Sequence, residues 1–214
     1  MDVNLVARCR AIATSTWSDA LDAAGLEGVI QGLTRRSGGG RLAGPAVTVR
    51  ESAAGLGDHS AAAFDVGAIL DAAGTGCVLA IDLGGAEVSA LGGLAADAAV
   101  RRGVAGAAID GGCRDLEAIQ AAGLWVSSRH VTPLTGRGRV RVEAINQPVS
   151  IGGVVVRPGD WIVGDETGLI RIEAAHLAEL LGRAEALEAR DRQFETALRR
   201  GERFGDVARR LGHL

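Results

Sequence analysis

Residues 105–115 read Ala-Gly-Ala-Ala-Ile-Asp-Gly-Gly-Cys-Arg-Asp, and this stretch indicates the fold class. Asp110 and two glycines follow the apolar run Ala105–Ile109, which is typical of a buried strand followed by a tight turn. Arg114 and Asp115 then open a helix that is predicted over Asp115–Ala122. A strand that passes through a glycine turn into a helix is the building unit of parallel α/β sheets.

The same alternation extends in both directions along the chain. Strands are predicted at Ala46–Arg50, Cys77–Ile81 and Leu124–Val126, because apolar and β-branched residues fill these short runs. Helices are predicted between them at Ala61–Ala73 and Ser89–Arg101. Strands that alternate with helices in this way pair in parallel, so we expect an α/β layer.

After residue 139 the pattern changes to short β segments that are separated by glycine-rich turns. The segments are Val140–Ala144, Val149–Ile151, Val154–Val156, Trp161–Gly164 and Leu169–Ile172. No linker precedes them, so we expect one α/β domain with a β-rich second half over residues 1–172. Two short helices, at Asp2–Ala13 and Ser18–Ala24, are expected to precede the sheet.

The end of the chain is predicted to be helical. Residues Glu173–Arg200 are rich in Ala, Leu and Glu and predict one long helix, which a short helix follows after Gly201. We therefore expect a C-terminal helical extension over residues 173–214. Such a charged helix packs on its own subunit or on a neighbouring one, and the sequence leaves both arrangements open.

The chain has 23 cationic side chains of the Lys and Arg type, and all of them are arginine. Without lysine, no Schiff base can form with a ketone substrate or with pyridoxal phosphate. A phosphate-binding loop of the G-x-x-x-x-G-K-[ST] type is excluded for the same reason.

Charge and hydropathy exclude further classes of partner. The net charge is -3 and no basic stretch is interleaved with aromatic residues, so we expect no nucleic-acid partner. No run of about 18 apolar residues and no signal-like N-terminal segment is found, which predicts a cytoplasmic protein without a membrane partner. The three cysteines and four histidines lack the spacing of a disulfide frame or of a zinc site.

Arg114 and Asp115 are the first candidate site residues, because ligands of open α/β sheets bind beyond the carboxyl ends of strands. Arg114 offers a fork of N–H donors that suits a carboxylate, and Asp115 offers an oxygen ligand that suits Mg²⁺. Together they could hold a 2-oxo acid by its carboxylate and, through a metal, by its ketone. The alternative is that Asp115 only stabilises a helix start and Arg114 is a surface charge.

A second glycine-rich turn, Gly92-Gly93-Leu94-Ala95, lies near a predicted helix start and could present backbone N–H groups to an anion. Twenty residues separate Gly93 from Arg114, about one helix plus one strand, so the two turns can lie side by side. Close packing of a helix rich in Gly and Ala is the alternative. Neither turn matches G-x-G-x-x-G, so neither a dinucleotide cofactor nor a methyltransferase is expected.

The run from Gly76 to Pro133 resembles the RraA-like family, and Ser18–Asp22, Gly44–Thr48 and Pro148–Ile172 add to the resemblance. The family includes divalent-metal-dependent 4-hydroxy-4-methyl-2-oxoglutarate aldolases, oxaloacetate decarboxylases and regulators of ribonuclease E activity. The resemblance implies an α/β fold of the swivelling β/β/α kind. It also implies a homotrimer or homohexamer with active sites between subunits.

The resemblance assigns roles to the candidate residues. In the aldolase members the Arg of the motif binds the carboxylate and ketone of pyruvate, and this role falls on Arg114. The next residue binds Mg²⁺, Mn²⁺ or another divalent metal, mostly through waters, and this role falls on Asp115. Backbone amides after the upstream glycines hold the carboxylate, and these fall on Leu94 and Ala95.

One departure from the aldolase pattern stands at Gly93, because aldolase members carry an acid at this position, 20 residues before the Arg-Asp pair. Aldolase members also supply an acid from the C-terminal helix of a neighbouring subunit. The candidates for this acid are Glu188, Asp191 and Glu195. Residues Gly55–His59 and the neighbouring subunit are expected to contact the distal group of the substrate, in a polar pocket.

The resemblance thus implies a class II aldolase that cleaves a 4-hydroxy-2-oxo acid to pyruvate and a second carbonyl compound. Decarboxylation of oxaloacetate would pass through the same pyruvate enolate. The alternative is a non-catalytic regulator that binds a protein partner such as ribonuclease E.

Overall fold

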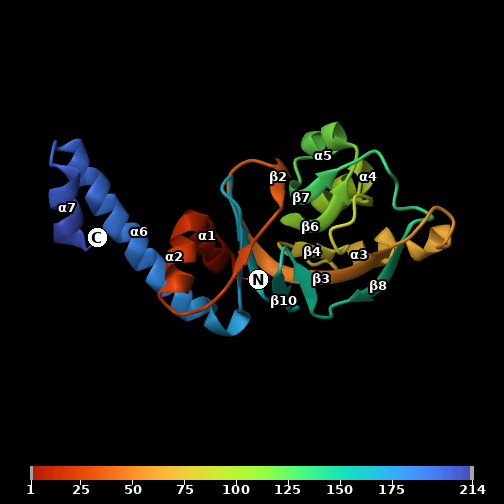
Figure 1. The fold of residues 1–214 in the computed structure, drawn as a ribbon, viewed down its shortest axis with the longest axis horizontal. Helices are drawn as coiled ribbons and strands as arrows, with labels where there is room; N and C mark the ends of the chain where they lie inside the picture. Colours follow the sequence, from red (N-terminus) through yellow and green to blue (C-terminus); the bar gives the residue numbers. More distant parts are fainter. Residues whose placement is uncertain (1, 213–214) are drawn as a thin grey trace.

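The run Gly106–Cys113 forms strand β6, in which every residue is buried, within a sheet of ten strands. The computed structural model describes residues 2–212 (Figure 1). Strand β6 pairs in parallel with β4 (Val78–Asp82) on one side and with β7 (Trp125–Val131) on the other. Strand β3 (Leu42–Ala53) pairs in parallel with β4, and four parallel strands therefore form the centre of the sheet.

Three helices cover one face of this parallel centre. Helix α3 (Val66–Ala72) connects β3 to β4, α4 (Gly93–Arg101) connects β4 to β6, and α5 (Leu116–Ala122) connects β6 to β7. Side chains such as Leu79, Ile109 and Ile119 are buried in the core between these helices and the sheet. The predicted α/β class is confirmed.

Strand β3 is long enough to belong to both halves of the sheet. Its first residues pair antiparallel with β11 (Trp161–Gly164), which pairs in turn with β12 (Leu169–Ile172) and then β1 (Val29–Ile30). Its last residues pair antiparallel with β8 (Val140–Ile145). The β-rich second half is therefore a continuation of the same sheet.

The opposite edge and the second face are closed by shorter elements. Strand β2 (Thr34–Ser37) pairs antiparallel with β7. Strands β9 (Val149–Ile151) and β10 (Val154–Val156) form a separate hairpin, and Ile151 is buried with Val78 and Ala108 of the sheet. Both faces of the parallel strands are thus covered, which explains why these strands read as continuous apolar runs.

The helical ends of the chain pack together beside β11 and β12. Helices α1 (Val3–Ala11) and α2 (Thr14–Asp22) share a core with Leu180, Leu181 and Ala184 of the long helix α6 (Leu177–Arg199). The far half of α6 projects away from the sheet and packs on α7 (Phe204–Leu211) (Figure 1). The predicted boundary between the α/β domain, residues 1–172, and the C-terminal helical extension, residues 173–214, stays a prediction. No helix within residues 2–212 is long and apolar enough to span a bilayer.

Several elements begin or end elsewhere than predicted. Helix α2 begins at Thr14 and not at Ser18, and strands β3 and β7 extend beyond the predicted Ala46–Arg50 and Leu124–Val126. Residues Ser89–Leu91 form strand β5 against the end of β6, so the helix predicted from Ser89 starts only at Gly93. The helix predicted over Ala61–Ala73 is divided into a 3₁₀ turn, Ala61–Ala63, and α3. Strand β6 continues through its glycines and does not end before them. Position 112 requires glycine, because a Cβ there would lie 2.6 Å from the carbonyl oxygen of Val88. Helical spacing alone does not reveal such close strand contacts.

Candidate functional site

Asp115 stands at the start of α5 in a backbone conformation that few side chains adopt. Its φ is +54° and its ψ +46°, in the left-handed region. Within residues 2–212, Asn146 is the only other non-glycine residue with a positive φ. Asp and Asn tolerate this region better than most residues, yet it still costs free energy. Such a strained residue motivates a functional hypothesis.

The carboxylate of Asp115 does not cap its own helix. No side-chain hydrogen bond caps α5, and Oδ2 of Asp115 instead accepts a hydrogen bond from the backbone N–H of Gly93 at 3.3 Å. The contact joins the starts of α4 and α5, as the spacing between Gly93 and Arg114 predicted. A helix-start role explains where Asp115 lies in the sequence, but it does not explain this contact.

The two glycines at the start of α4 are required because side chains at the start of α5 approach them closely. A Cβ on Gly92 would lie 2.9 Å from Oδ2 of Asp115 and 3.2 Å from Nε of Arg114. A Cβ on Gly93 would lie 2.5 Å from the Cβ of Ala118 on α5. The space that an acid at position 93 would enter is therefore taken by Ala118, which fits the departure from the aldolase pattern.

Arg114 and Asp115 form a loose pair rather than a closed ion pair. Nε of Arg114 lies 3.6 Å from Oδ2 of Asp115, and the two side chains are 41% and 49% exposed. Solvent-exposed pairs of this kind contribute little, about 0–1 kcal/mol, to stability. Both groups therefore remain able to bind a ligand.

A cavity of about 330 Å³ opens beside this pair. Its polar lining consists of Arg114, Asp115 and Ser89, together with backbone at Gly92. Its apolar lining comes from α3, the segment before it, and α4, and the side chains include Phe64, Val66, Leu70, Leu94, Ala95 and Ala98. The volume suits a small organic molecule.

The start of α4 adds anion-binding donors to the cavity. No side chain caps α4, and Leu94 and Ala95 belong to its first turn, whose N–H groups have no acceptor inside the helix. Leu94 is 91% exposed and lines the cavity. An anion in the cavity would therefore meet both the positive end of the helix dipole and the guanidinium of Arg114.

The carboxylates near the cavity limit how a metal could be held. Within residues 2–212, no group of three or more His, Cys, Asp or Glu side chains could hold a metal ion. Asp115 is the one acidic side chain among the described residues that line the cavity. Mg²⁺ is commonly bound by one or two carboxylates and keeps several of its waters. A single half-exposed carboxylate fits this mode and not a closed protein cage.

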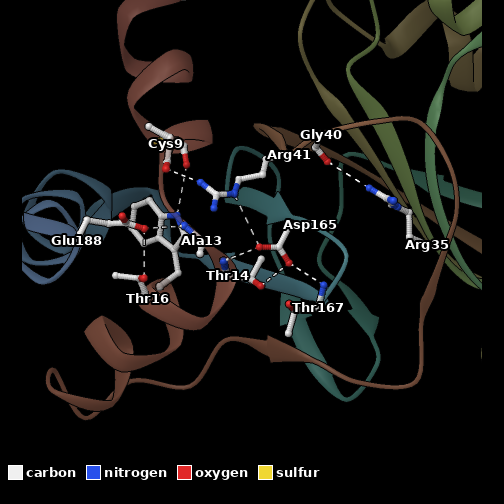
Figure 2. A network of polar contacts seen from close by, with 12 residues as sticks. Cys9, Ala13, Thr14, Thr16, Arg35, Gly40, Arg41, Asp165, Thr167 and Glu188 are labelled. Carbon is white, nitrogen blue, oxygen red and sulfur yellow. Dashed lines mark hydrogen bonds and ion pairs between the residues drawn. The ribbon is translucent and has the colours of Figure 1, made fainter. Parts of the chain in front are cut away.

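Glu188, one of the three tail acids, is engaged within its own chain (Figure 2). Its Oε1 accepts hydrogen bonds from the backbone N–H of Ala13 at 3.2 Å and from the hydroxyl of Thr16 at 3.3 Å. Its other oxygen lies 3.6 Å from Nη1 of Arg192. Glu188 therefore stabilises the start of α2. Farther along α6, Glu195 is exposed and pairs with Arg199.

Asp165 binds the same helix start from the turn between β11 and β12 (Figure 2). It accepts hydrogen bonds from the N–H and the hydroxyl of Thr14, at 2.9 and 2.6 Å, and from the N–H of Thr167 at 2.8 Å. Burial raises the pKa of Asp165, but these hydrogen bonds and one from Gly168 outweigh burial and lower the pKa. The α2 start, the turn and α6 thus form one polar junction, which is distinct from the cavity.

The structure brings together the residues that the sequence singled out, from Gly92 to Ala95 with Arg114 and Asp115. Sequence analysis missed the wall that Phe64, Val66 and Leu70 form. Residues Gly55–His59, which were expected to contact the distal group, do not line the cavity. The apolar residues at positions 64, 66 and 70 could have indicated this cavity wall. Their spacing is equally typical of the buried face of a helix, so the sequence did not distinguish the two.

Comparisons with known proteins identify the family of the chain. The family model for RraA-like proteins, described as Aldolase/RraA, matches residues 14–171. A protein of Halalkalibacterium halodurans, provisionally named a 4-hydroxy-4-methyl-2-oxoglutarate aldolase, is 31% identical over 198 residues, which cover 92% of this chain and 90% of that protein. Protein DlpA of Legionella pneumophila is 30% identical over 86% of this chain, and the match spans only 30% of DlpA.

A solved structure supports the fold. The crystal structure of RraAS2 from Streptomyces coelicolor, described as an unusual member of the RNase ES inhibitor RraA protein family, superposes with a TM-score of 0.80. The sequences are 25% identical, and the match covers 92% of this chain and 98% of that one.

Proposed function

Because the chain belongs to the RraA-like family, we propose that it is a metal-dependent carbon–carbon lyase that forms pyruvate. The substrate class is a 4-hydroxy-2-oxo acid, and the second product is an aldehyde or ketone. The observation that carries the proposal is the strained, cavity-facing Asp115 beside Arg114 and the first turn of α4.

Arg114 would bind and orient the 2-oxo acid. Its guanidinium presents parallel N–H donors that match a carboxylate, and the free N–H groups of Leu94 and Ala95 offer further donors to the same anion. As the pyruvate enolate develops, its negative charge grows next to Arg114. Donors that are already in place stabilise such charge without reorganisation.

Asp115 would hold the metal, Mg²⁺ or Mn²⁺ or a similar ion, through its half-exposed carboxylate, whose Oδ2 the N–H of Gly93 orients. A bound divalent cation supplies a Lewis acid that stabilises the negative charge of the enolate and lowers the pKa of nearby water. The chain has no lysine to form an imine, so its own residues contribute cations only as arginine. Loss of CO₂ from oxaloacetate would yield the same enolate, so one site can serve both reactions.

Assembly and location are part of the proposal. We infer a homotrimer or homohexamer in which a neighbouring C-terminal helix brings an acid to the cavity, and we infer that it acts in the cytoplasm. The 91% exposure of Leu94 at the edge of the cavity supports a covered surface there. Because Glu188 serves its own α2, the exposed Glu195 fits this role better than Glu188 does.

The test is pyruvate release from a panel of 4-hydroxy-2-oxo acids, which includes 4-hydroxy-4-methyl-2-oxoglutarate and analogues with an uncharged C4 substituent, and from oxaloacetate, with Mg²⁺ and then with a chelator. Asp115→Asn should abolish metal-dependent release, whereas Asp97→Asn, an exposed acid on α4 that does not line the cavity, should leave it unchanged. Turnover that persists in Asp115→Asn would refute the mechanism. No turnover by the wild type, combined with tight binding to ribonuclease E, would establish the regulator instead.

A further inference from the structure

The wall of the cavity opposite the charged pair is apolar. Helix α4 packs against α5 on one side and against α3 on the other, so it lies between the two groups of lining residues. Arg114 and Asp115 precede α5, whereas Phe64, Val66 and Leu70 belong to α3 and the segment before it. A ligand that reaches from the charged pair across α4 therefore ends against hydrocarbon side chains.

Charge is absent from this wall. Among the described residues that line the cavity, Arg114 is the one cation, and it is needed for the carboxylate next to the ketone. A second carboxylate, at the far end of the substrate, would have to leave water without gaining a cation from this subunit. Burial of an unpaired charge against apolar side chains is strongly unfavourable.

We propose that the natural substrate is a 4-hydroxy-2-oxo acid whose distal group is uncharged and apolar, an alkyl or aryl substituent on C4, and not a dicarboxylate. This inference rests on the proposed function. The apolar wall supplies the favourable part of the preference, because each methylene group that moves from water into the cavity should raise affinity about fourfold.

The reaction on such a substrate balances without a further reactant. The hydroxyl on C4 loses its proton, its oxygen forms a carbonyl with C4, and the bond between C3 and C4 breaks. The electron pair of that bond forms the enolate of pyruvate, and a proton then adds to C3. The products are pyruvate and an aldehyde or ketone that carries the apolar group.

Binding of two uncleavable probes tests the inference directly. 2-Oxohexanoate and 2-oxoadipate have the same number of carbon atoms and lack the hydroxyl on C4, but only 2-oxoadipate ends in a second carboxylate. Isothermal titration calorimetry with Mg²⁺ should show that 2-oxohexanoate binds at least tenfold more tightly. Equal affinity, or tighter binding of 2-oxoadipate, would overturn the inference.

A variant pair ties the preference to the cavity wall. Ala98→Arg places a cation on the lining and should reverse the preference towards 2-oxoadipate, whereas Val100→Arg, on the same helix but outside the lining, should not. Thermal unfolding verifies that both variants fold. If 2-oxohexanoate binds tightly but no 4-hydroxy-2-oxo acid yields pyruvate, the inference about the cavity holds and the proposed lyase activity fails. The two ideas are thus separable.

Discussion

Oδ2 of Asp115 lies 3.3 Å from the backbone nitrogen of Gly93, and this hydrogen bond connects two helix starts that are far apart in the sequence. It holds Asp115, the one acidic group among the described residues that line the cavity, beside Arg114 and the free amides of α4. The left-handed backbone of Asp115 costs conformational free energy. Helix capping does not offset this cost, because the carboxylate does not cap α5. This cost without a gain in capping supports the proposed role of Asp115 in ligand binding.

Gly92→Ala should reduce activity more than stability. Its new Cβ would lie 2.9 Å from Oδ2 of Asp115, the movable end of a side chain, so the fold survives while the carboxylate is displaced. Misplacing a catalytic group by about 1 Å can cost on the order of 100-fold in rate. We expect that loss in kcat/KM for pyruvate release. The control Gly182→Ala, inside α6 with no atom within 4 Å of its new Cβ, should stabilise the protein and keep full activity.

Arg114→Lys should keep the charge but lose the planar fork. Removing an oriented donor to developing negative charge costs about 2–4 kcal/mol of transition-state stabilisation, roughly 30- to 1000-fold in kcat/KM. Steady-state kinetics measures the effect, with Arg101→Lys on the exposed face of α4 as the control. A lysine variant with wild-type kcat/KM would show that bidentate binding plays no part.

Glu51→Gln should stabilise the protein at neutral pH. Glu51 on β3 is 5% exposed, neither carboxylate oxygen has a hydrogen-bond partner among the described residues, and burial raises its pKa from 4.5 to about 8. Between these values the folded state keeps a proton that the unfolded state releases. The free energy of unfolding therefore falls as pH rises through this window and levels off above it, by an amount on the order of 3 kcal/mol by pH 7.

Urea unfolding at pH 5, 7 and 8 measures this difference. The gap between Glu51→Gln and the wild type should widen as the pH rises from 5 to 8. Parallel curves for the two proteins would mean that Glu51 is ionised in the folded state at pH 5.

Asp165→Ala should weaken the start of α2 without affecting the cavity. Loss of a carboxylate that accepts both hydrogen bonds from Thr14 should cost about 1–2 kcal/mol, as for other helix caps. For a chain of this size each kcal/mol lowers Tm by about 2–4 °C. Calorimetry should show that drop while pyruvate release at 25 °C stays unchanged. The carboxylate acts only when ionised, so its contribution is lost as pH falls through its lowered pKa.

The sequence alone was sufficient for the α/β class, because apolar runs and glycine turns report burial and chain reversal locally. It also located Arg114 and Asp115 at the end of a strand and excluded lysine chemistry. Strand β5 could not be predicted, because Ser89–Leu91 adopts its conformation only through pairing with β6. Local spacing carries no information about such a partner.

The tertiary structure alone decided the character of the site. The left-handed backbone of Asp115 and the place of Phe64 on the cavity wall depend on how α3, α4 and α5 pack. The sequence did not distinguish Glu188 from the two other C-terminal acids as the residue that reaches a neighbouring site. The structure shows that Glu188 contacts the start of α2 in its own chain. A sequence reveals which groups are present and roughly which are buried. Which groups face one another follows from packing between elements that are distant along the chain.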